Sequence, residues 1–239
     1  MIRRLRQLVR DRLADRLDVP SYRASLDRLQ RGGFAPQLVV DVGAYRGEFT
    51  ADCRKRWPDA RVVAIEPASA SFARLQERYA GDAKVVVHRA IADAEGGASK
   101  VLHFAETASS VLDEHVQQGF PSESCVTVRV DELVAREPGA PTSIDLLKVD
   151  VQGYSLPVLR GAERALGPNT VIASEVDLLD IHRGASLLDE VLAWAGFRDF
   201  VVFDIAGLSR RPLDKALWQV DLILVHRDSQ WRRDKRWEA

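Results

Sequence analysis

The sequence predicts one doubly wound α/β domain, built on a mostly parallel sheet of about seven strands and preceded by a helical extension. Three observations predict it. From residue 38 onward, short apolar runs alternate with helical stretches, which is typical of βαβ units. The runs are almost continuously apolar, as in strands buried on both faces. No clear helical pattern separates the last two runs, so the last strand is expected to lie antiparallel to its neighbour.

The first 31 residues are rich in arginine and carry an apolar residue at helical spacing. These apolar positions are Ile2, Leu5, Val9, Leu13 and Leu17. They predict an amphipathic helix, followed by a short helix over 22–29. The apolar face of the first helix is expected to pack on the domain or on a second subunit, which makes a homodimer possible. A helix for a membrane surface or a polyanion is the alternative, but acidic residues among the arginines disfavour it.

The remaining elements follow in chain order. The expected strands are 38–42, 61–65, 84–88, 144–149, 170–176, 200–204 and 217–225. The expected helices are 48–57, 69–79 with Ser69 as N-cap, 156–166 and 186–195. The helical pattern lapses between 91 and 131, where β pieces are expected at 101–104 and 125–130. The segments are therefore a helical extension at 1–32, the domain at 33–228 and a polar, solvated tail at 229–239.

Composition favours a soluble globular enzyme over several other classes of protein. Of the 239 residues, 46% are hydrophobic and 29% are charged, and the net charge is -1, so no strong field would attract nucleic acid. The two cysteines, Cys53 and Cys125, are too few for a disulfide framework or a zinc site. No apolar run has the length of a membrane span, and the first residues lack the pattern of a secretory signal. We expect a cytoplasmic protein without a nucleic-acid or membrane partner.

The stretch "VVDVGAYRGEFT" (39–50) joins the first strand to the first helix of the domain. Asp41 lies at the end of the strand, and Gly43 and Gly47 stand four residues apart. Glycine allows close approach of the backbone to a ligand, and ligands bind at the carboxyl ends of parallel strands. The turn, with Ala44 and Tyr45, is therefore predicted to bind a ligand.

The next strand supplies a second, independent signal. It ends in "VVAIEP", so Glu66 and Pro67 follow an apolar strand. Glu66 stands nineteen positions after Gly47. A carboxylate at this place commonly binds the ribose hydroxyls of an adenosine cofactor. The chain has neither a G-x-G-x-x-G nor a G-x-x-x-x-G-K-[ST] phosphate motif, and Asp41 would repel phosphate. S-adenosylmethionine is therefore favoured over NAD or ATP.

Five motifs carry a resemblance to a known family. "VVDVGAYRGEFT", "AIEP", "AIADAEG", "VTVRVDEL" and "IDLLKVDVQGYSLPVLRGAE" occur in the order and spacing of FkbM-family S-adenosylmethionine-dependent methyltransferases. The resemblance covers about residues 33–226, and "LLKVDVQG" followed by "LRGAE" is its most specific part. It implies a Rossmann-like, seven-stranded sheet with an antiparallel last strand. It also implies O-methylation of hydroxyls on sugars, glycans or polyketide- or peptide-type natural products, as in natural product biosynthesis.

The resemblance implies site residues by position. Asp41, Gly43 and Gly47 would form the cofactor turn, and Glu66 would be the carboxylate that binds the ribose. Ala92 and Asp93 would lie beside the adenine, and Ser109 and Ser110 match a serine-containing stretch of the family. Lys148, Asp150 and Gly153 match the fourth-strand motif, which faces the cofactor and the acceptor. The chain departs from the family at two places. Tyr45 stands where Asn is common, and Ser155, shortly before Pro157, stands where Glu is common.

Methyl transfer to an alcohol requires a group that takes up the hydroxyl proton. The candidates at strand ends are Asp150, Glu175, Asp177 and His182. Glu175 is the more informative because it interrupts a buried strand, whereas His182 also fits a solvated loop. Lys148 would neutralise carboxylates, donate a hydrogen bond to the acceptor or the cofactor, or form a structural ion pair. The four candidates would also suit a divalent metal; the sequence does not separate the two, and no metal is predicted.

Three further expectations remain open at this level. The polar segment 107–124 is expected to act as a lid over the site. The methyl acceptor would be a nitrogen or a carbon in an alternative enzymatic interpretation. In a third interpretation, the domain binds the cofactor or a partner without catalysis.

Overall fold

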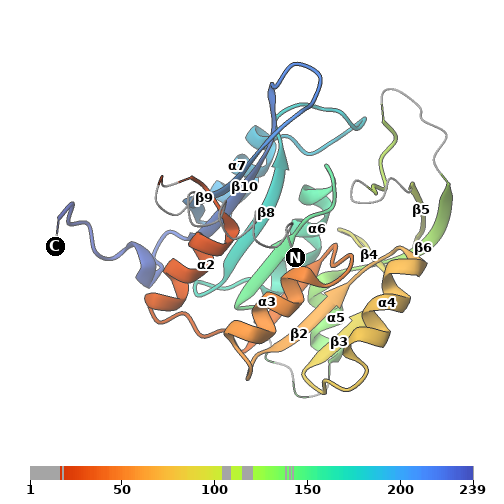
Figure 1. Ribbon diagram of the computed structural model, residues 1–239, viewed down its shortest axis with the longest axis horizontal. Coiled ribbons are helices and arrows are strands. Elements are labelled where there is room, and N and C mark those ends of the chain that lie inside the picture. The colour runs from red at the N-terminus through yellow and green to blue at the C-terminus, as the bar shows by residue number, and fades with distance from the viewer. Residues whose placement is uncertain are drawn as a thin grey trace, which may run out of the picture.

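The computed structural model describes residues 17, 19–103, 109–114, 121–137, 139, 141 and 143–238. The first predicted helix lies almost entirely outside these residues, and so does much of the predicted lid segment. Figure 1 shows the sheet running through the middle of the domain, with helices α2, α3 and α4 in front of it.

The main sheet has seven strands in the order β3-β2-β1-β7-β8-β10-β9. They are β1 (Leu38–Val42), β2 (Arg61–Ile65), β3 (Val85–His88), β7 (Leu146–Val149), β8 (Val171–Asp177), β9 (Phe200–Arg210) and β10 (Leu217–His226). Strand β10 lies between β8 and β9 and is antiparallel to both, while the strands from β3 to β8 pair in parallel. The predicted doubly wound, Rossmann-like sheet with an antiparallel last strand is therefore confirmed.

Helices cover both faces of the sheet. One face carries α2 (Tyr22–Arg31), α3 (Glu48–Arg56) and α4 (Ser69–Tyr79), and the other carries α5 (Val130–Arg136), α6 (Ser155–Ala162) and α7 (Leu188–Phe197). Successive residues of a strand point to opposite faces. In β1, Val39 packs with the α2 and α3 side and Val40 with the side of α5 to α7. Both faces are buried, which explains the continuous apolar runs.

A small second sheet fills the region where the helical pattern lapses. It consists of β4 (Ile91–Ala92), β6 (Ser122–Val128) and β5 (Ser99–His103), in that order. The β pieces were expected at 101–104 and 125–130, so both begin earlier than predicted. Helix α5, which follows, was not predicted, because seven residues are too few to show a helical period.

The start of α4 differs from the prediction. Ala68, not Ser69, is the N-cap residue, and its side chain forms no capping bond. Ser69 is the first helical residue, and its N–H donates to Glu123 Oε1 at 2.6 Å. A carboxylate on β6 thus supplies the acceptor that a capping hydroxyl would supply, which no local pattern could reveal.

The tail is less solvated than predicted at its start. Trp231, in the short 3₁₀ helix η3 (Gln230–Arg232), packs edge-on against Phe34 at a centroid distance of 5.8 Å.

In the part of the chain that the structure describes, no helix is long and apolar enough to cross a membrane.

The "LRGAE" motif contains a glycine, Gly161, at a position where the fold leaves no room for a side chain. A Cβ added at Gly161 would lie 2.0 Å from the Asp93 carbonyl oxygen, so α6 packs directly on the segment after β4. Gly161→Ala is therefore expected to lower the free energy of unfolding by at least about 1–3 kcal/mol, measured by urea denaturation. Gly196→Ala, at an open position of α7, is the control and should stabilise by about 0.5–1 kcal/mol. Equal effects at the two sites would contradict this explanation.

Candidate active site

A cavity of about 430 Å³ opens at the carboxyl ends of β1, β2 and β7. It is lined by predicted site residues Gly43, Tyr45, Glu66, Pro67, Ala92, Ser109, Ser110 and Asp150, and also by Gln152 and Tyr154. Its volume is in the range of sites for small molecules and cofactors. Its position is the one expected for a ligand crevice in a parallel sheet.

Both glycines of the turn are required by close packing. Gly43 has φ +75°, its N–H donates to the Ile65 carbonyl at 3.0 Å, and a Cβ there would lie 1.9 Å from the Asp150 carbonyl oxygen. Gly47 also has φ +75°, and a Cβ there would lie 2.7 Å from Leu75 Cδ2. The turn thus closely approaches Asp150, which directly follows β7, and Leu75 of α4. Of the two glycines, only Gly43 lines the cavity, and Ala44 is buried behind it.

Tyr45 keeps the backbone role of the turn despite its departure from the family residue. Its φ is +49°, in the left-handed region that Asn adopts more readily than Tyr. Its N–H donates to Glu66 Oε2 at 2.7 Å, and the Arg46 guanidinium lies 4.8 Å from its ring centroid. The substitution therefore changes the wall of the cavity and leaves the backbone bond to Glu66 in place.

Glu66 lies directly after β2 and is 6% exposed. Oε1 accepts the Ala68 N–H at 2.9 Å and Oε2 accepts the Tyr45 N–H at 2.7 Å. Burial raises the pKa of the Glu66 carboxyl, and these two N–H groups partly offset the rise. Each carboxylate oxygen can accept a second hydrogen bond. Glu66 is therefore held as a bidentate acceptor at the wall of the cavity, which suits two neighbouring hydroxyls.

Asp41 lies behind the turn rather than at the cavity. It is fully buried, and Oδ2 accepts the Thr50 hydroxyl at 2.7 Å. Oδ1 lies 3.3 Å from Lys148 Nζ on the neighbouring strand. The direct cofactor contact expected of Asp41 is not offered by this arrangement, because its carboxylate faces the protein's own cation.

Lys148 joins the turn to β7. Its Nζ donates to the Gly43 carbonyl at 2.9 Å and lies 3.2 Å from Asp150 Oδ2. Burial lowers the pKa of Lys148, but Asp150 and Asp41 outweigh it and the net pKa is raised. Lys148 is therefore a buried cation that forms the predicted ion pair with carboxylates. Its hydrogen bond goes to the Gly43 carbonyl, whereas the sequence interpretation gave it an acceptor or cofactor as the partner.

Of the two residues predicted to lie near the adenine, only one lines the cavity. Ala92 lines the cavity, but Asp93 does not: its Oδ1 accepts the Ala94 N–H at 2.6 Å and its Oδ2 pairs with Lys100 Nζ at 2.6 Å. Lys100 also donates to the Tyr154 hydroxyl, and the Tyr154 side chain is part of the cavity wall. Asp93 therefore supports the wall through Lys100, a relation that spacing in the sequence does not reveal.

Ser110 connects the segment between β5 and β6 to the motif after β7. Its hydroxyl donates to the Gln152 carbonyl at 2.8 Å, and both Ser109 and Ser110 line the cavity. Gly153 follows with φ +85°. The serine stretch thus meets Gln152 of the "VQG" motif at one wall, whereas Gly153 is not among the residues that line the cavity.

Asp150, Glu175 and Asp177 lie near one another at the ends of β7 and β8. Asp150 lines the cavity, and its side chain is 41% exposed. Gln219 Nε2 on β10 donates to Glu175 Oε1 and to Asp177 Oδ1, both at 2.9 Å, and Gln152 Nε2 donates to Glu175 Oε1 at 2.8 Å. The sequence interpretation missed both glutamines, although Gln219 is a polar residue within the last apolar strand.

The pKa values in this group are raised. Burial raises the pKa of Glu175 well above its ordinary value, and the charges of Asp150, Asp221 and Asp177 add to the rise. Burial also raises the pKa of Asp177 to about 6, against the hydrogen bond from Gln219. Carboxyls with such pKa values gather at functional sites more often than elsewhere.

His182 is neither at the cavity nor in a solvated loop. It is 2% exposed, burial lowers its pKa, and its Nδ1 has no hydrogen-bond partner among the described residues. Ser155, which replaces the common Glu, donates its hydroxyl to the Glu175 carbonyl at 2.8 Å and so fixes the start of α6 to β8. Pro157 is the third residue of α6, within the first turn, where proline is tolerated.

The candidate residues do not come together as a metal site within the described part of the chain. Within the residues that the structure describes, no group of three or more His, Cys, Asp and Glu side chains could hold a metal ion. The four candidates Asp150, Glu175, Asp177 and His182 therefore do not form one ligand set.

Comparisons with known proteins agree with this architecture. The S-adenosylmethionine-dependent methyltransferase from Geobacter sulfurreducens in complex with S-adenosyl-L-homocysteine is 12% identical, with a TM-score of 0.50, and the match covers 85% of this chain and 90% of that one. The ribosomal protein L11 methylase from Lactobacillus delbrueckii subsp. bulgaricus is 14% identical, with a TM-score of 0.47, covering 83% and 74%. The first likeness shows the fold. No curated protein sequence matches the chain.

The family model described as "Methyltransferase FkbM domain" matches residues 41–202, which is more than half of the 239 residues. The matched range contains the glycine turn, Glu66 and the carboxylates of β7 and β8. The chain therefore belongs to the FkbM methyltransferase family.

Proposed function

We propose that the protein is an S-adenosylmethionine-dependent methyltransferase that methylates a hydroxyl of a sugar, a glycan or a polyketide- or peptide-type natural product. The observation that carries the proposal is Glu66, held at the cavity wall by two backbone N–H groups with acceptor capacity left on both oxygens. Family membership supports the reaction. The solved relative from Geobacter sulfurreducens contains S-adenosyl-L-homocysteine, which supports the cofactor.

The residues present fit this cofactor. Glu66 would accept the two ribose hydroxyls, the apolar wall at Ala92 and Leu102 would receive the adenine, and the backbone of Gly43 would border the methionine part. The cavity volume of about 430 Å³ is sufficient for one such molecule. When bound, the cofactor supplies a methyl group on a positively charged sulfur.

The protein's part in the reaction is positioning and proton uptake. An acceptor hydroxyl must be held in line with the methyl group and must lose its proton as it attacks. Asp150 is the candidate base that lines the cavity, so we assign the proton to its carboxylate. Lys148, 3.2 Å from Asp150 Oδ2, orients that carboxylate from behind.

Glu66→Gln tests the cofactor assignment. Glutamine keeps one acceptor oxygen and loses the charge, so we expect binding of S-adenosylmethionine to weaken about 10- to 100-fold, measured by isothermal titration calorimetry. Glu77→Gln, on the exposed side of α4, is the matched control and should bind as the wild type does. Unchanged affinity in the folded Glu66→Gln variant would refute the ribose assignment.

A transfer assay separates the acceptor classes. Radiolabelled S-adenosylmethionine is incubated with the protein and with panels of sugars, phenols and amines. Transfer to a hydroxyl is the expected result. Transfer to nitrogen or carbon would correct the acceptor, and cofactor binding without transfer to any class would favour a non-catalytic domain.

A further inference from the structure

Four carboxyls gather beside the cofactor cavity on the sheet face that α2 and α3 cover. We call Asp150, Glu175, Asp177 and Asp221 the carboxylate cluster. Glu175 and Asp221 are direct partners in the antiparallel ladder of β8 and β10. Like charges opposite each other in a sheet are destabilising. A requirement other than stability is needed to explain this pairing.

The fold makes room for Asp221. A Cβ on Gly207, its partner in β9, would lie 1.9 Å from Asp221 Oδ2, so the carboxylate occupies the space of that missing side chain. Burial raises the pKa of Asp221 to about 6, and the charge of Asp150 contributes to the rise. This carboxyl is therefore ionised in most molecules above pH 6.

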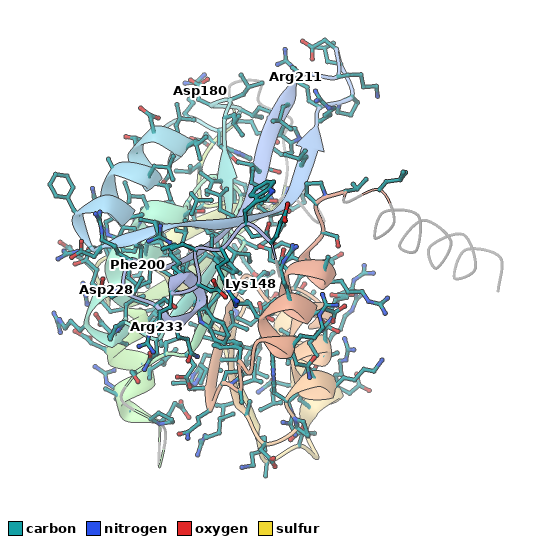
Figure 2. The ribbon with its side chains drawn as sticks, turned by 90° about the vertical axis from the view of Figure 1, so that its left-hand side faces the viewer. Lys148, Asp180, Phe200, Arg211, Asp228 and Arg233 are labelled. Carbon is teal, nitrogen blue, oxygen red and sulfur yellow. The ribbon has the colours of Figure 1, made fainter. Side chains whose placement is uncertain are left out.

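Of the four carboxyls, only Asp150 has a cation in an ion pair with it among the described residues. Lys148 pairs with Asp41 and Asp150. Among the described residues, no Lys or Arg forms an ion pair with Glu175, Asp177 or Asp221, and the donors to Glu175 and Asp177 are the neutral amides of Gln152 and Gln219. Buried carboxylates usually have a cationic partner. Figure 2 shows Lys148 in the interior of the molecule, close to the helices of the N-terminal half.

Two buried polar atoms, one in the cluster and one on α2, have no hydrogen-bond partner among the described residues. Asp177 is 1% exposed, and its Oδ2 forms no hydrogen bond to a described residue. The Tyr22 hydroxyl is likewise buried without a hydrogen-bond partner in the described part of the chain. Burial raises the Tyr22 pKa, and the charges of Asp221, Asp150 and Glu175 add to the rise. These atoms point to a ligand that provides hydrogen bonds and charge.

Aromatic rings lie near the cluster, and Asp150 connects it to the cofactor cavity. The rings of Tyr22 and Phe49 meet edge to face at 6.3 Å, and Lys148 Nζ lies 5.9 Å from the Phe49 centroid, so aromatic rings border the cluster. Aromatic faces attract cations. Asp150 belongs to the cluster and also lines the cofactor cavity. A molecule anchored here can place a hydroxyl beside the methyl group.

We propose that the methyl acceptor carries a protonated amine, as in an amino sugar, and that this amine binds at the carboxylate cluster while a nearby hydroxyl is methylated. The inference rests on the proposed function and names its substrate class. An ammonium group has three donors and one positive charge, which supply what Glu175, Asp177 and Asp221 lack. A neutral sugar would supply hydrogen bonds without the charge.

The experiment compares two probes that differ in one group. Methyl 2-amino-2-deoxyglucoside and methyl glucoside are titrated calorimetrically into protein saturated with S-adenosylhomocysteine. At pH 7.5 we expect the amine to bind at least 10-fold more tightly. The preference should shrink at pH 5, because Asp221 then holds a proton. Asp221→Asn should reduce the preference at least fivefold, and Glu175→Gln provides a second variant.

Asp228→Asn is the control, because Asp228 is exposed and lies away from Lys148 in Figure 2. It should keep the full preference for the amine. Equal affinity for the two probes, no measurable binding of the amine, or a preference that folded Asp221→Asn and Glu175→Gln retain would overturn the inference. The titration with S-adenosylhomocysteine is recorded first, so a failure of the proposed function, seen as no cofactor binding, is distinguished from a failure of this inference.

Discussion

Replacing Lys148 with methionine is expected to lower the free energy of unfolding by about 3–5 kcal/mol, because the change leaves a buried carboxylate without its cation. Asp41 is fully buried, and Lys148 is its cationic partner at 3.3 Å. The change also removes the donor to the Gly43 carbonyl. Urea denaturation followed by circular dichroism measures the effect.

The double variant Asp41→Asn/Lys148→Met is the matched control. It removes the charge together with its partner, so part of the lost stability should return. The turn should still lose order, because the Gly43 carbonyl remains without its donor. If Lys148→Met unfolded at the urea concentration of the wild type, the assignment of Lys148 as the cation that fixes the turn would be wrong.

Asp177→Asn is expected to stabilise the protein, by about 1–3 kcal/mol at pH 8 and by almost nothing at pH 4. Burial raises the pKa of Asp177 from 3.8 to about 6. Between these values the folded protein holds a proton that the unfolded chain has released, so this carboxyl makes the free energy of unfolding fall as the pH rises. Asparagine has no such cost, and its oxygen can still accept from Gln219.

The measurement is a series of urea denaturations between pH 4 and pH 8 on Asp177→Asn, with the exposed Asp228→Asn as control. The gain from Asp177→Asn should grow through pH 4 to 6 and then level off, while the control stays flat. A constant gain, or a loss at pH 8, would show that the Asp177 carboxylate is compensated. The expected gain would mean that the protein keeps a destabilising carboxylate, which is typical of binding sites.

The elements that could be predicted from the sequence are those whose information is local. Strand β1 and helix α4 have the predicted bounds because burial on two faces and a helical period are visible in a single segment. The glycine turn and Glu66 were identifiable because one connection and one strand end determine their place. The cavity brings Gly43 and Glu66 together as that interpretation required.

The features that could not be predicted depend on contacts between distant segments. Asp93 is turned away from the cavity by Lys100, and Ser69 is capped by Glu123 from the second sheet. His182 lies in the interior, although the charged Asp180 and Arg183 stand close to it in the chain. Gln219 meets Glu175 across 44 positions. No local pattern encodes which strand lies opposite, so the carboxylate cluster becomes visible only in the folded chain.

Equilibrium dialysis with radiolabelled S-adenosylmethionine, competed with NAD and with ATP, tests the central claim most directly. The geometry of Glu66 and the glycine turn predicts one site per chain, from which S-adenosylhomocysteine displaces the label and NAD and ATP do not. No bound label, or displacement by NAD or ATP as readily as by S-adenosylhomocysteine, would contradict the assignment of the cavity to this cofactor.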